Sequence, residues 1–100
     1  MPDKFCSMIG FAKRAGKIIY GYDTLVSARR VKLYAVSTTA SDKLKSNMKL
    51  LADKSSRPLV TANELENIVG NNCKALGITD ENMAKAMLDC AKSDRSRYGI

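Results

Sequence analysis

Three basic side chains near the N-terminus are the residues best suited to binding an anion. Lys13, Arg14 and Lys17 stand close together, shortly before Gly21. An Arg can clamp a phosphate through two N–H groups, while a Lys acts as a mobile point charge. The N–H groups of a helix that starts after Gly21 would also favour an anion. These residues predict a phosphate-binding surface; the alternative is that they are solvated charges at a helix end.

The same segment matches neither of the common glycine-rich nucleotide-binding loops. The phosphate-binding loop needs the pattern G-x-x-x-x-G-K-[ST] after a strand. Gly10 stands one residue too far from Gly16, and Ile18 replaces the hydroxyl that would hold magnesium. The fingerprint G-x-G-x-x-G is also absent. We therefore expect no nucleotide cofactor.

Catalytic and metal-binding patterns are weak as well. The chain has no His, which removes the commonest general base and the commonest metal ligand. Cys6, Cys73 and Cys90 form no CxxC pair, and we interpret them as reduced thiols. Asp80 and Glu81 fit the capped start of a helix. We predict no catalytic residue, no metal and no cofactor; an enzyme that uses a thiol or carboxylate in a crevice is the alternative.

Charge is unevenly distributed along the 100 residues. Lys and Arg number 17 and Asp and Glu number 10, so the formal net charge is +7. Residues 1–50 hold 10 basic and 3 acidic groups, whereas residues 51–100 hold 7 of each. A polyanionic partner would explain an excess confined to the first half, nucleic acid first and a membrane surface second. The alternative is a basic protein without such a partner.

Length and hydropathy are typical of one compact domain. Hydrophobic residues make up 45%, and no apolar run approaches the roughly 20 residues of a membrane helix. The first four residues lack the blocks of a signal peptide. We expect one cytoplasmic, monomeric domain over residues 1–92 and a polar, loose tail over residues 93–100. A membrane or a small-molecule substrate is not expected as a partner.

Hydrophobic periodicity divides the domain into alternating helices and short strands. Helices are predicted between Asp3 and Gly16, over residues 22–30, after a Ser41 cap, between Glu64 and Gly70, and after Thr79. The predicted strands are Ile18–Tyr20, Leu33–Val36, Leu59–Val60 and Ala75–Ile78. This alternation implies a mixed or mainly parallel sheet with helices on both faces. We predict an α/β fold, a three-layer α/β/α sandwich with a four-stranded mixed sheet.

Three finer expectations concern the ends and faces of these helices. Arg29 and Arg30 are predicted at the C-terminal end of the second helix, where the helix dipole favours cations. Val26 is predicted on the inward face of that helix. Thr61 and Glu64 have the spacing of a capping box, in which each side chain bonds the other's backbone N–H.

Short segments spread along the chain carry a likeness to a known family. They are Phe11–Ile19 with its A-K-R-A-G-K string, Gly21, Leu33–Val36, Ala40–Ser41, Leu65, Gly70 and Ile78–Asp80. In these features the chain resembles bacterial YlxQ-type proteins of the ribosomal kink-turn RNA-binding family, and the resemblance covers about residues 3–91. The resemblance implies an α/β/α sandwich, a structured RNA partner and a ribosomal or ribonucleoprotein context.

The resemblance also implies where RNA would bind. The family's surface comprises the exit of the first strand, the start of the second helix and a loop before the last strand. Gly21 matches the family pattern, but Asp23 stands at its Asn position, Thr24 at its Glu and Ser27 at its Lys. A carboxylate accepts hydrogen bonds from a guanine edge but cannot donate to its O6. These departures bear on kink-turn specificity.

The second wall of the implied surface corresponds to Asn71, Asn72 and Cys73, where the family is usually apolar. We therefore predict a small non-catalytic RNA-binding protein. The expected phosphate and base contacts are Lys13, Arg14, Lys17, Gly21, Asp23, Thr24, Asn71, Asn72 and Cys73. The alternative is a protein-interaction module that keeps the family fold without kink-turn recognition.

Overall fold

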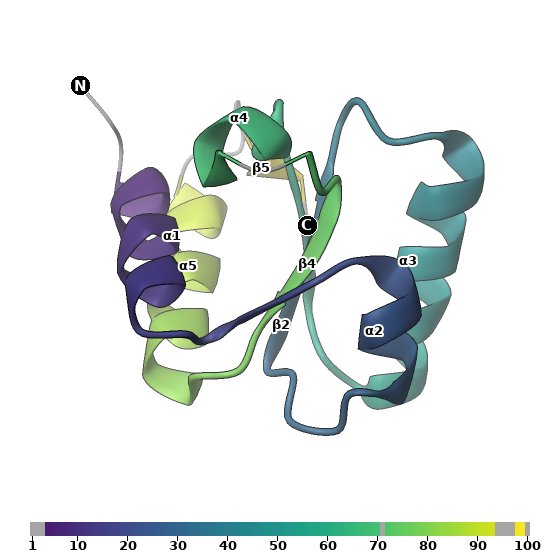
Figure 1. The fold of residues 1–100 in the computed structure, drawn as a ribbon, viewed down its shortest axis with the longest axis horizontal. Coiled ribbons are helices and arrows are strands. Elements are labelled where there is room, and N and C mark those ends of the chain that lie inside the picture. Colours follow the sequence, from purple (N-terminus) through teal and green to yellow (C-terminus); the bar gives the residue numbers. More distant parts are fainter. Residues whose placement is uncertain (1–3, 71, 94–97, 100) are drawn as a thin grey trace.

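The structure is a computed structural model that describes residues 4–70, 72–93 and 98–99 (Figure 1). Its elements are α1 (Lys4–Arg14), β1 (Ile18–Tyr20), α2 (Tyr22–Ser27), β2 (Leu33–Ser37), α3 (Asp42–Ser55), β3 (Leu59–Ala62), α4 (Leu65–Val69), β4 (Ala75–Ile78), α5 (Glu81–Ser93) and β5 (Tyr98–Gly99). The predicted order of one helix followed by four strand–helix units is confirmed. A short strand after α5 is added to it.

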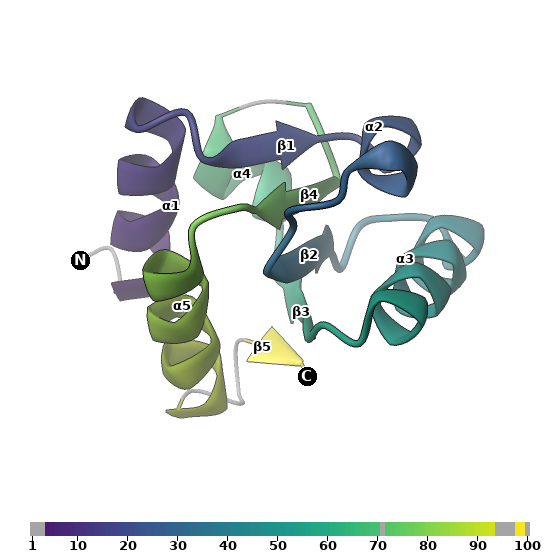
Figure 2. The same cartoon turned by 90° about the horizontal axis from the view of Figure 1, so that it is seen from below.

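The strands form one mixed sheet in the order β1-β4-β2-β3-β5. β2 and β3 are parallel, whereas β4 pairs antiparallel with both β1 and β2, and β5 pairs antiparallel with β3. The predicted mixed sheet is confirmed, but the predicted number of four strands is wrong, because β5 adds a fifth. Figure 2 shows β1 and β5 at opposite edges of the sheet.

The fifth strand lies in the segment expected to be a loose tail. Tyr98 pairs with Ala62, and Gly99 pairs with Thr61. Tyr98 is only 4% exposed, and its ring centroid lies 4.4 Å from that of Phe5. Burial of this aromatic ring holds the end of the chain against the sheet. The expectation therefore fails at residues 98–99, while residues 94–97 and 100 lie outside the described residues.

Helices cover both faces of the sheet (Figure 1). On one face, Ile9, Leu65 and Met87 from α1, α4 and α5 belong to one hydrophobic cluster. On the other face, Leu25 and Met48 from α2 and α3 belong to a second cluster. The central strands β2 and β4 are buried at every position, as strands covered on both faces must be.

Several predicted caps are confirmed, and the tyrosine of the predicted strand Leu33–Val36 lies in the core. Ser41 Oγ accepts the backbone N–H three residues into α3 at 3.2 Å, and Asp80 Oδ1 accepts the equivalent N–H of α5 at 2.9 Å. Gly70 ends α4 with φ of 72°. Tyr34 is 1% exposed, in the core rather than available to a base. The Asp3 cap lies outside the described residues.

The second helix is shorter than predicted. It ends at Ser27, because Ala28 adopts an extended backbone with φ of −78° and ψ of 136°. Arg29 and Arg30 therefore lie in the following loop, and their predicted place at a helix end is wrong. Val31 is only 4% exposed, and the extended backbone after Ser27 places its side chain in the core, where burial of apolar surface stabilises this early helix end.

The predicted capping box at Thr61 and Glu64 is wrong. Thr61 belongs to β3 and pairs with Val36 of β2. Glu64 takes a left-handed backbone with φ of 49° and makes no side-chain cap. The Leu65 N–H instead donates to Ser37 Oγ at 3.2 Å. Sheet pairing and a buried hydroxyl from β2 thus replace the local cap that the spacing suggested.

The lengths of the helices limit both membrane spanning and the binding of anions at helix N-termini. α3 has 14 residues and α5 has 13, but α2 has 6 and α4 has 5. Within the described ranges, no helix is both long and apolar enough to cross a membrane. The first turn of α2 offers backbone N–H groups to an anion, yet so short a helix adds only a small dipole to them.

Candidate nucleic-acid interface

The start of α2 and the loop before β4 lie side by side. The Gly21 N–H donates to the Ala75 carbonyl at 3.0 Å, and the neighbouring Tyr20 pairs with Leu76. Gly21 has φ of 88°, a conformation that glycine adopts without strain. The two segments that the resemblance assigns to the RNA surface therefore meet at the end of β1.

Besides Gly21, four of the predicted RNA-contacting residues that the structure describes belong to these two segments. Asp23 and Thr24 are exposed on the first turn of α2. Asn72 is exposed and Cys73 is half-buried in the loop before β4. Asn71 lies outside the described residues. Hydroxyl, carboxylate and amide groups therefore occur on the two segments that meet beside Gly21, a set that can exchange hydrogen bonds with base edges.

Lys13 reaches from α1 to the C-terminal end of α4, where the loop toward β4 begins. Its Nζ donates to the carbonyl of Val69 at 2.9 Å, and a Cβ built on Gly70 would lie 3.5 Å from the same nitrogen. The ammonium group thus ties the end of α1 to the end of α4, just before the loop that leads to β4. Because an ammonium carries three N–H donors, two are left for an anion.

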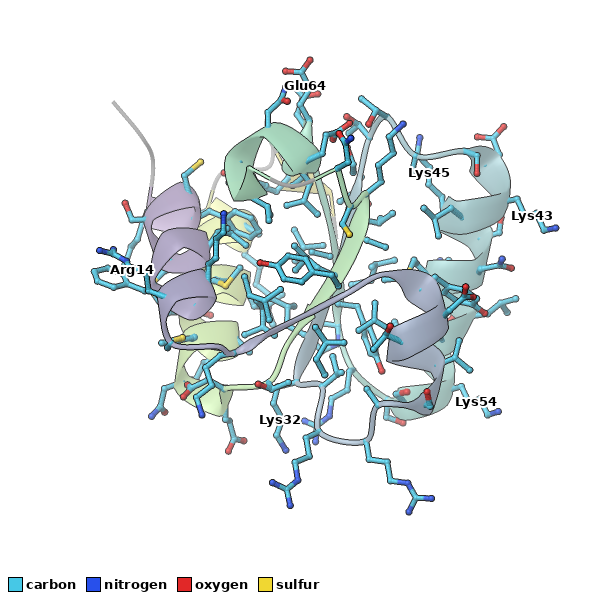
Figure 3. The ribbon with its side chains drawn as sticks, viewed as in Figure 1. Arg14, Lys32, Lys43, Lys45, Lys54 and Glu64 are labelled. Atoms are coloured by element: carbon cyan, nitrogen blue, oxygen red, sulfur yellow. The ribbon has the colours of Figure 1, made fainter. Side chains whose placement is uncertain are left out.

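Arg14 is directed elsewhere. Its Nε donates to the Gly10 carbonyl at 3.4 Å, and its guanidinium carbon lies 5.1 Å from the centre of the Phe11 ring. Figure 3 shows Arg14 on the outer side of α1, away from α2. Its partners are on its own helix, so the structure does not bring Arg14 to the Gly21 junction.

Lys17 lies at the opposite end of β1. Its carbonyl accepts the Thr79 N–H at 2.9 Å and the Thr79 hydroxyl at 3.2 Å. Four residues of extended chain separate Lys17 from Gly21, which is about 13 Å at the usual rise of a strand. The three basic residues that stand together in the sequence therefore occupy three different places on the molecule.

A polar network that the sequence analysis did not identify supports the loop before β4. Ser37 is fully buried at the end of β2, and its hydroxyl donates to Glu66 Oε1 at 2.6 Å. The Thr39 hydroxyl donates to the other oxygen of Glu66. The Lys74 Nζ donates to the Thr39 carbonyl at 3.4 Å. The sequence did contain a signal for this network, since Ser37 directly follows the apolar run Leu33–Val36 and a buried hydroxyl needs hydrogen-bond partners.

The network keeps Glu66 ionised. The hydrogen bond from Ser37 lowers the pKa of the Glu66 carboxyl below its usual 4.5, and the bond from Thr39 and the charge of Lys74 act in the same direction. A carboxylate with a lowered pKa is a poor proton acceptor near neutral pH. We therefore interpret this network as structural support for α4 and the adjoining loop.

The thiols lie apart from this junction, with one exception. Cys6 in α1 and Cys90 in α5 are half-buried, as is Cys73. Cys90 lines a hollow beside Lys4 and Asp89. Over residues 4–70, 72–93 and 98–99, no group of three potential metal-binding side chains is found. Because the chain lacks His, no imidazole can activate the Cys90 thiol, and thiol catalysis stays an untested alternative.

An apolar groove separates α2 from α3. It has a volume of about 330 Å³ and is lined by Tyr22, Val26, Ala28, Leu50, Leu51, Lys54 and Ser55. Val26 is 53% exposed and Leu50 is 68% exposed. The prediction that Val26 faces inward is therefore wrong, because Leu25 is the residue of α2 that is fully buried.

Comparisons with known proteins support the fold. No family model matches the chain, and no curated protein matches it. A solved structure from Bacillus halodurans, described as a protein with unknown function, is similar with a TM-score of 0.83. The two share 20% sequence identity, and the match covers 91% of this chain and 99% of that one. At this identity the likeness shows that the chain has the mixed α/β fold of that protein.

Proposed function

We propose that this chain is a small non-catalytic RNA-binding protein that recognises structured, kink-turn-like RNA in a ribosomal or ribonucleoprotein context. The proposal takes the fold as a three-layer α/β/α sandwich of the kind that the resemblance implies. It assigns base contacts to the junction of α2 with the loop before β4. It assigns phosphate contacts to the basic residues that precede β2, in the half of the sequence that holds the whole net charge.

One observation carries the proposal. The 3.0 Å hydrogen bond from Gly21 to Ala75 holds the start of α2 against the first residue of β4, next to the loop that the resemblance makes the second wall of the RNA site. Lys13 reaches from α1 to Val69, where the loop that forms the second wall begins. An extruded base could therefore contact polar groups from both walls while a cation lies near its phosphate.

The side chains at the junction limit which base edges could be read. The Thr24 hydroxyl can donate or accept, whereas the Asp23 carboxylate only accepts, so it would take the N–H groups of guanine. Ser27 has no charge for a phosphate, and its hydroxyl donates to the Thr24 carbonyl at 3.4 Å. We therefore expect weaker discrimination of the G·A pairs than the family pattern of Asn, Glu and Lys would give.

A fluorescence titration with a labelled kink-turn RNA hairpin tests the proposal. The control RNA has its G·A pairs replaced by Watson–Crick pairs, and both are measured at two salt concentrations. Tighter binding to the kinked hairpin supports the proposal. Equal binding to both, with a steep salt dependence, would indicate charge attraction without recognition of the kink. Absence of binding at low salt would refute RNA binding.

Restoring the family residues provides a matched variant. Asp23→Asn, Thr24→Glu and Ser27→Lys all change exposed positions on α2, so the fold should tolerate them. If the junction reads the kink, the triple variant should bind the kink-turn hairpin at least tenfold more tightly, as expected for one or two good polar base contacts at about 1–3 kcal/mol each. Its affinity for the control RNA should change little. An equal gain on both RNAs would place base recognition elsewhere.

The groove between α2 and α3 favours the second candidate, a protein-interaction module. Val26 and Leu50 expose apolar surface on either side of it, and Lys54 is its charged lining residue. Arg29 and Arg30 follow directly on Ala28, another lining residue, which adds positive charge at one end. Such a groove fits an amphipathic helix of another protein with apolar side chains flanked by carboxylates.

Affinity capture from ribonuclease-treated lysate distinguishes this candidate. Leu50→Glu would place a charge in the groove, and Phe11→Glu is the matched control because Phe11 is 53% exposed on α1. A protein captured by wild type and by Phe11→Glu, but not by Leu50→Glu, would support a docking role. Capture that is indifferent to Leu50 would argue against it.

A further inference from the structure

Strand register places three basic residues in a row across one end of the sheet. The Lys17 carbonyl accepts the Thr79 N–H at the end of β4, at 2.9 Å. On the other side of β4, the Lys32 N–H donates to the Ile78 carbonyl at 2.7 Å. Lys17 and Lys32 therefore flank the end of the same strand, about 10 Å apart at the usual spacing of paired strands.

The row continues onto β3. β2 and β3 are parallel, with Tyr34 opposite Leu59 and the Tyr34 N–H bonded to the Pro58 carbonyl at 3.0 Å. Two residues before this pair in the same parallel register, Lys32 lies opposite Arg57. The row from Lys17 through Lys32 to Arg57 is therefore about 15 Å long.

Two more cations join this end of the molecule. Arg29 and Arg30 are exposed in the loop that leads from α2 into Lys32 and β2. Lys17, Arg29, Arg30, Lys32 and Arg57 together are called the basic rim. Figure 3 shows Lys32 at the lower end of the view, below the sheet, and Lys54 at the lower end of α3.

Carboxylates near the rim do not balance it. Asp80 and Glu81 follow the end of β4, and Asp53 lines a hollow together with Arg57. Asp80 is already engaged, because its Oδ1 accepts the Met83 N–H at 2.9 Å. Five cations thus face three carboxylates, and the surface is positive.

The opposite end of β1 has a different balance. Lys13 and Lys74 each donate one hydrogen bond to a backbone carbonyl on that side, and the carboxylates of Asp23 in α2 and Glu66 in α4 offset their charge. That side offers polar groups for bases but little net positive charge for a series of phosphates. The basic rim, in contrast, offers positive charge for phosphates and few polar groups for bases.

We propose that the basic rim holds the RNA backbone, while the Gly21 junction contacts bases at the other end of β1. This inference rests on the proposed function and adds a second contact surface to it. A row about 15 Å long can face several successive phosphates of one strand. Arg29, Arg30 and Arg57 can each bind a phosphate through two N–H groups. The bound RNA would then pass from the junction along β1, which is an edge strand of the sheet, and turn across the rim at the end of that strand.

A rim variant and a charge-matched control test the proposal. The rim variant combines Lys17→Ala, Arg29→Ala, Arg30→Ala and Lys32→Ala. The control combines Lys43→Ala, Lys45→Ala, Lys49→Ala and Lys92→Ala on α3 and α5. Each loses four positive charges, so the net charge of both falls from +7 to +3. A difference in RNA binding between the two variants therefore reflects where the lost charges lie and not how many are lost.

Binding of the labelled kink-turn hairpin is measured over a series of salt concentrations. Each lost phosphate contact should reduce the slope of log K against log salt by roughly 0.7–0.9, so the rim variant should lose about 3 from its slope. The control should keep the wild-type slope. A second variant, Arg29→Glu with Arg30→Glu, changes only the exposed loop and should weaken binding by at least tenfold. Thermal melts of all proteins confirm folding.

The possible outcomes separate this inference from the proposed function. If the wild type binds the kink-turn hairpin and both quadruple variants lose slope equally, the rim is not a specific surface and only this inference falls. If the wild type does not bind at low salt, the proposed function falls with it. Vesicles of phosphatidylserine form the last arm: rim-dependent vesicle binding in a protein that ignores RNA would assign the rim to a membrane surface and overturn the inference.

Discussion

Gly77 of β4 packs so closely against Leu25 of α2 and against Val31 that an added side chain would collide with both. A Cβ built on Gly77 lies 2.6 Å from Leu25 Cδ2 and 2.7 Å from Val31 Cγ1. Leu25 is fully buried and Val31 is 4% exposed, so neither side chain can swing into solvent. Gly77→Ala should therefore push α2 and the following loop away from the sheet.

The cost can be estimated from two opposing contributions. Forcing an extra methyl group into a packed core typically costs about 1–3 kcal/mol. Replacing glycine reduces the entropy of the unfolded chain and returns roughly 0.4–1 kcal/mol. The net expected loss is about 1–2 kcal/mol. For a domain of this size that corresponds to a melting temperature lower by roughly 4–16 °C.

Thermal unfolding followed by circular dichroism measures the effect, with Gly10→Ala as the control. Gly10 lies inside α1 and a Cβ there would meet no atom within 4 Å. The same chemical change should stabilise the protein by about 0.5–1 kcal/mol at that position. Opposite signs at the two glycines are therefore expected. A Gly77→Ala protein that melts at or above the wild-type temperature would refute the close packing of α2 on β4.

Three further results are expected. Ser37→Ala should cost about 1–3 kcal/mol in urea unfolding, because the Leu65 N–H and the Glu66 carboxylate each lose a buried partner. The hydrogen bond from Ser37, followed by that from Thr39, lowers the pKa of Glu66, so the stability that these bonds supply should be present above pH 4.5 and fall as the pH drops below it. Glu66→Gln should flatten that part of a curve of unfolding free energy against pH. An unchanged curve would contradict this expectation. Tyr98→Ala should cost about 2–4 kcal/mol by removing the buried ring that packs on Phe5, whereas a loose tail would give no change in the melting temperature.

Periodicity predicted the order of the elements because each pattern is local. The apolar run Leu33–Val36 marked a strand covered on both faces, and β2 is buried throughout. Ser41 and Asp80 were identified as caps because their bonds reach only three residues along the chain. Such features depend on neighbours that the sequence itself displays.

The errors arose where distant residues decide the local structure. Thr61 had the spacing of a cap, but pairing with Val36 of β2 took it into a strand. Tyr98 had no periodic neighbours to mark a strand, yet contact with Phe5 and pairing with Ala62 hold it against the sheet. A strand of two residues leaves no pattern of its own, because its stability comes from the edge on which it docks.

Of the candidate site, the junction was predictable and the charge distribution was not. The exit of β1 and the start of α2 are contiguous in sequence, so Gly21, Asp23 and Thr24 could be grouped in advance. Their second wall was identified only through the resemblance, and the hydrogen bond from Gly21 to Ala75 supplies its physical basis. The network of Ser37 with Glu66 joins residues far apart in the chain, so no spacing rule could identify it.

Proximity in sequence was a poor guide to where the positive charge acts. Lys13 and Arg14 are adjacent, but one helical step turns them about 100° apart, and they bond to different elements. Lys17 follows the turn that starts β1, which carries it to the far end of the sheet. Its neighbours there, Lys32 and Arg57, stand just before β2 and β3, further along the chain. Because the strand order β1-β4-β2-β3 creates that row, the amount of charge is a property of the sequence, whereas the surface that presents it is a property of the topology.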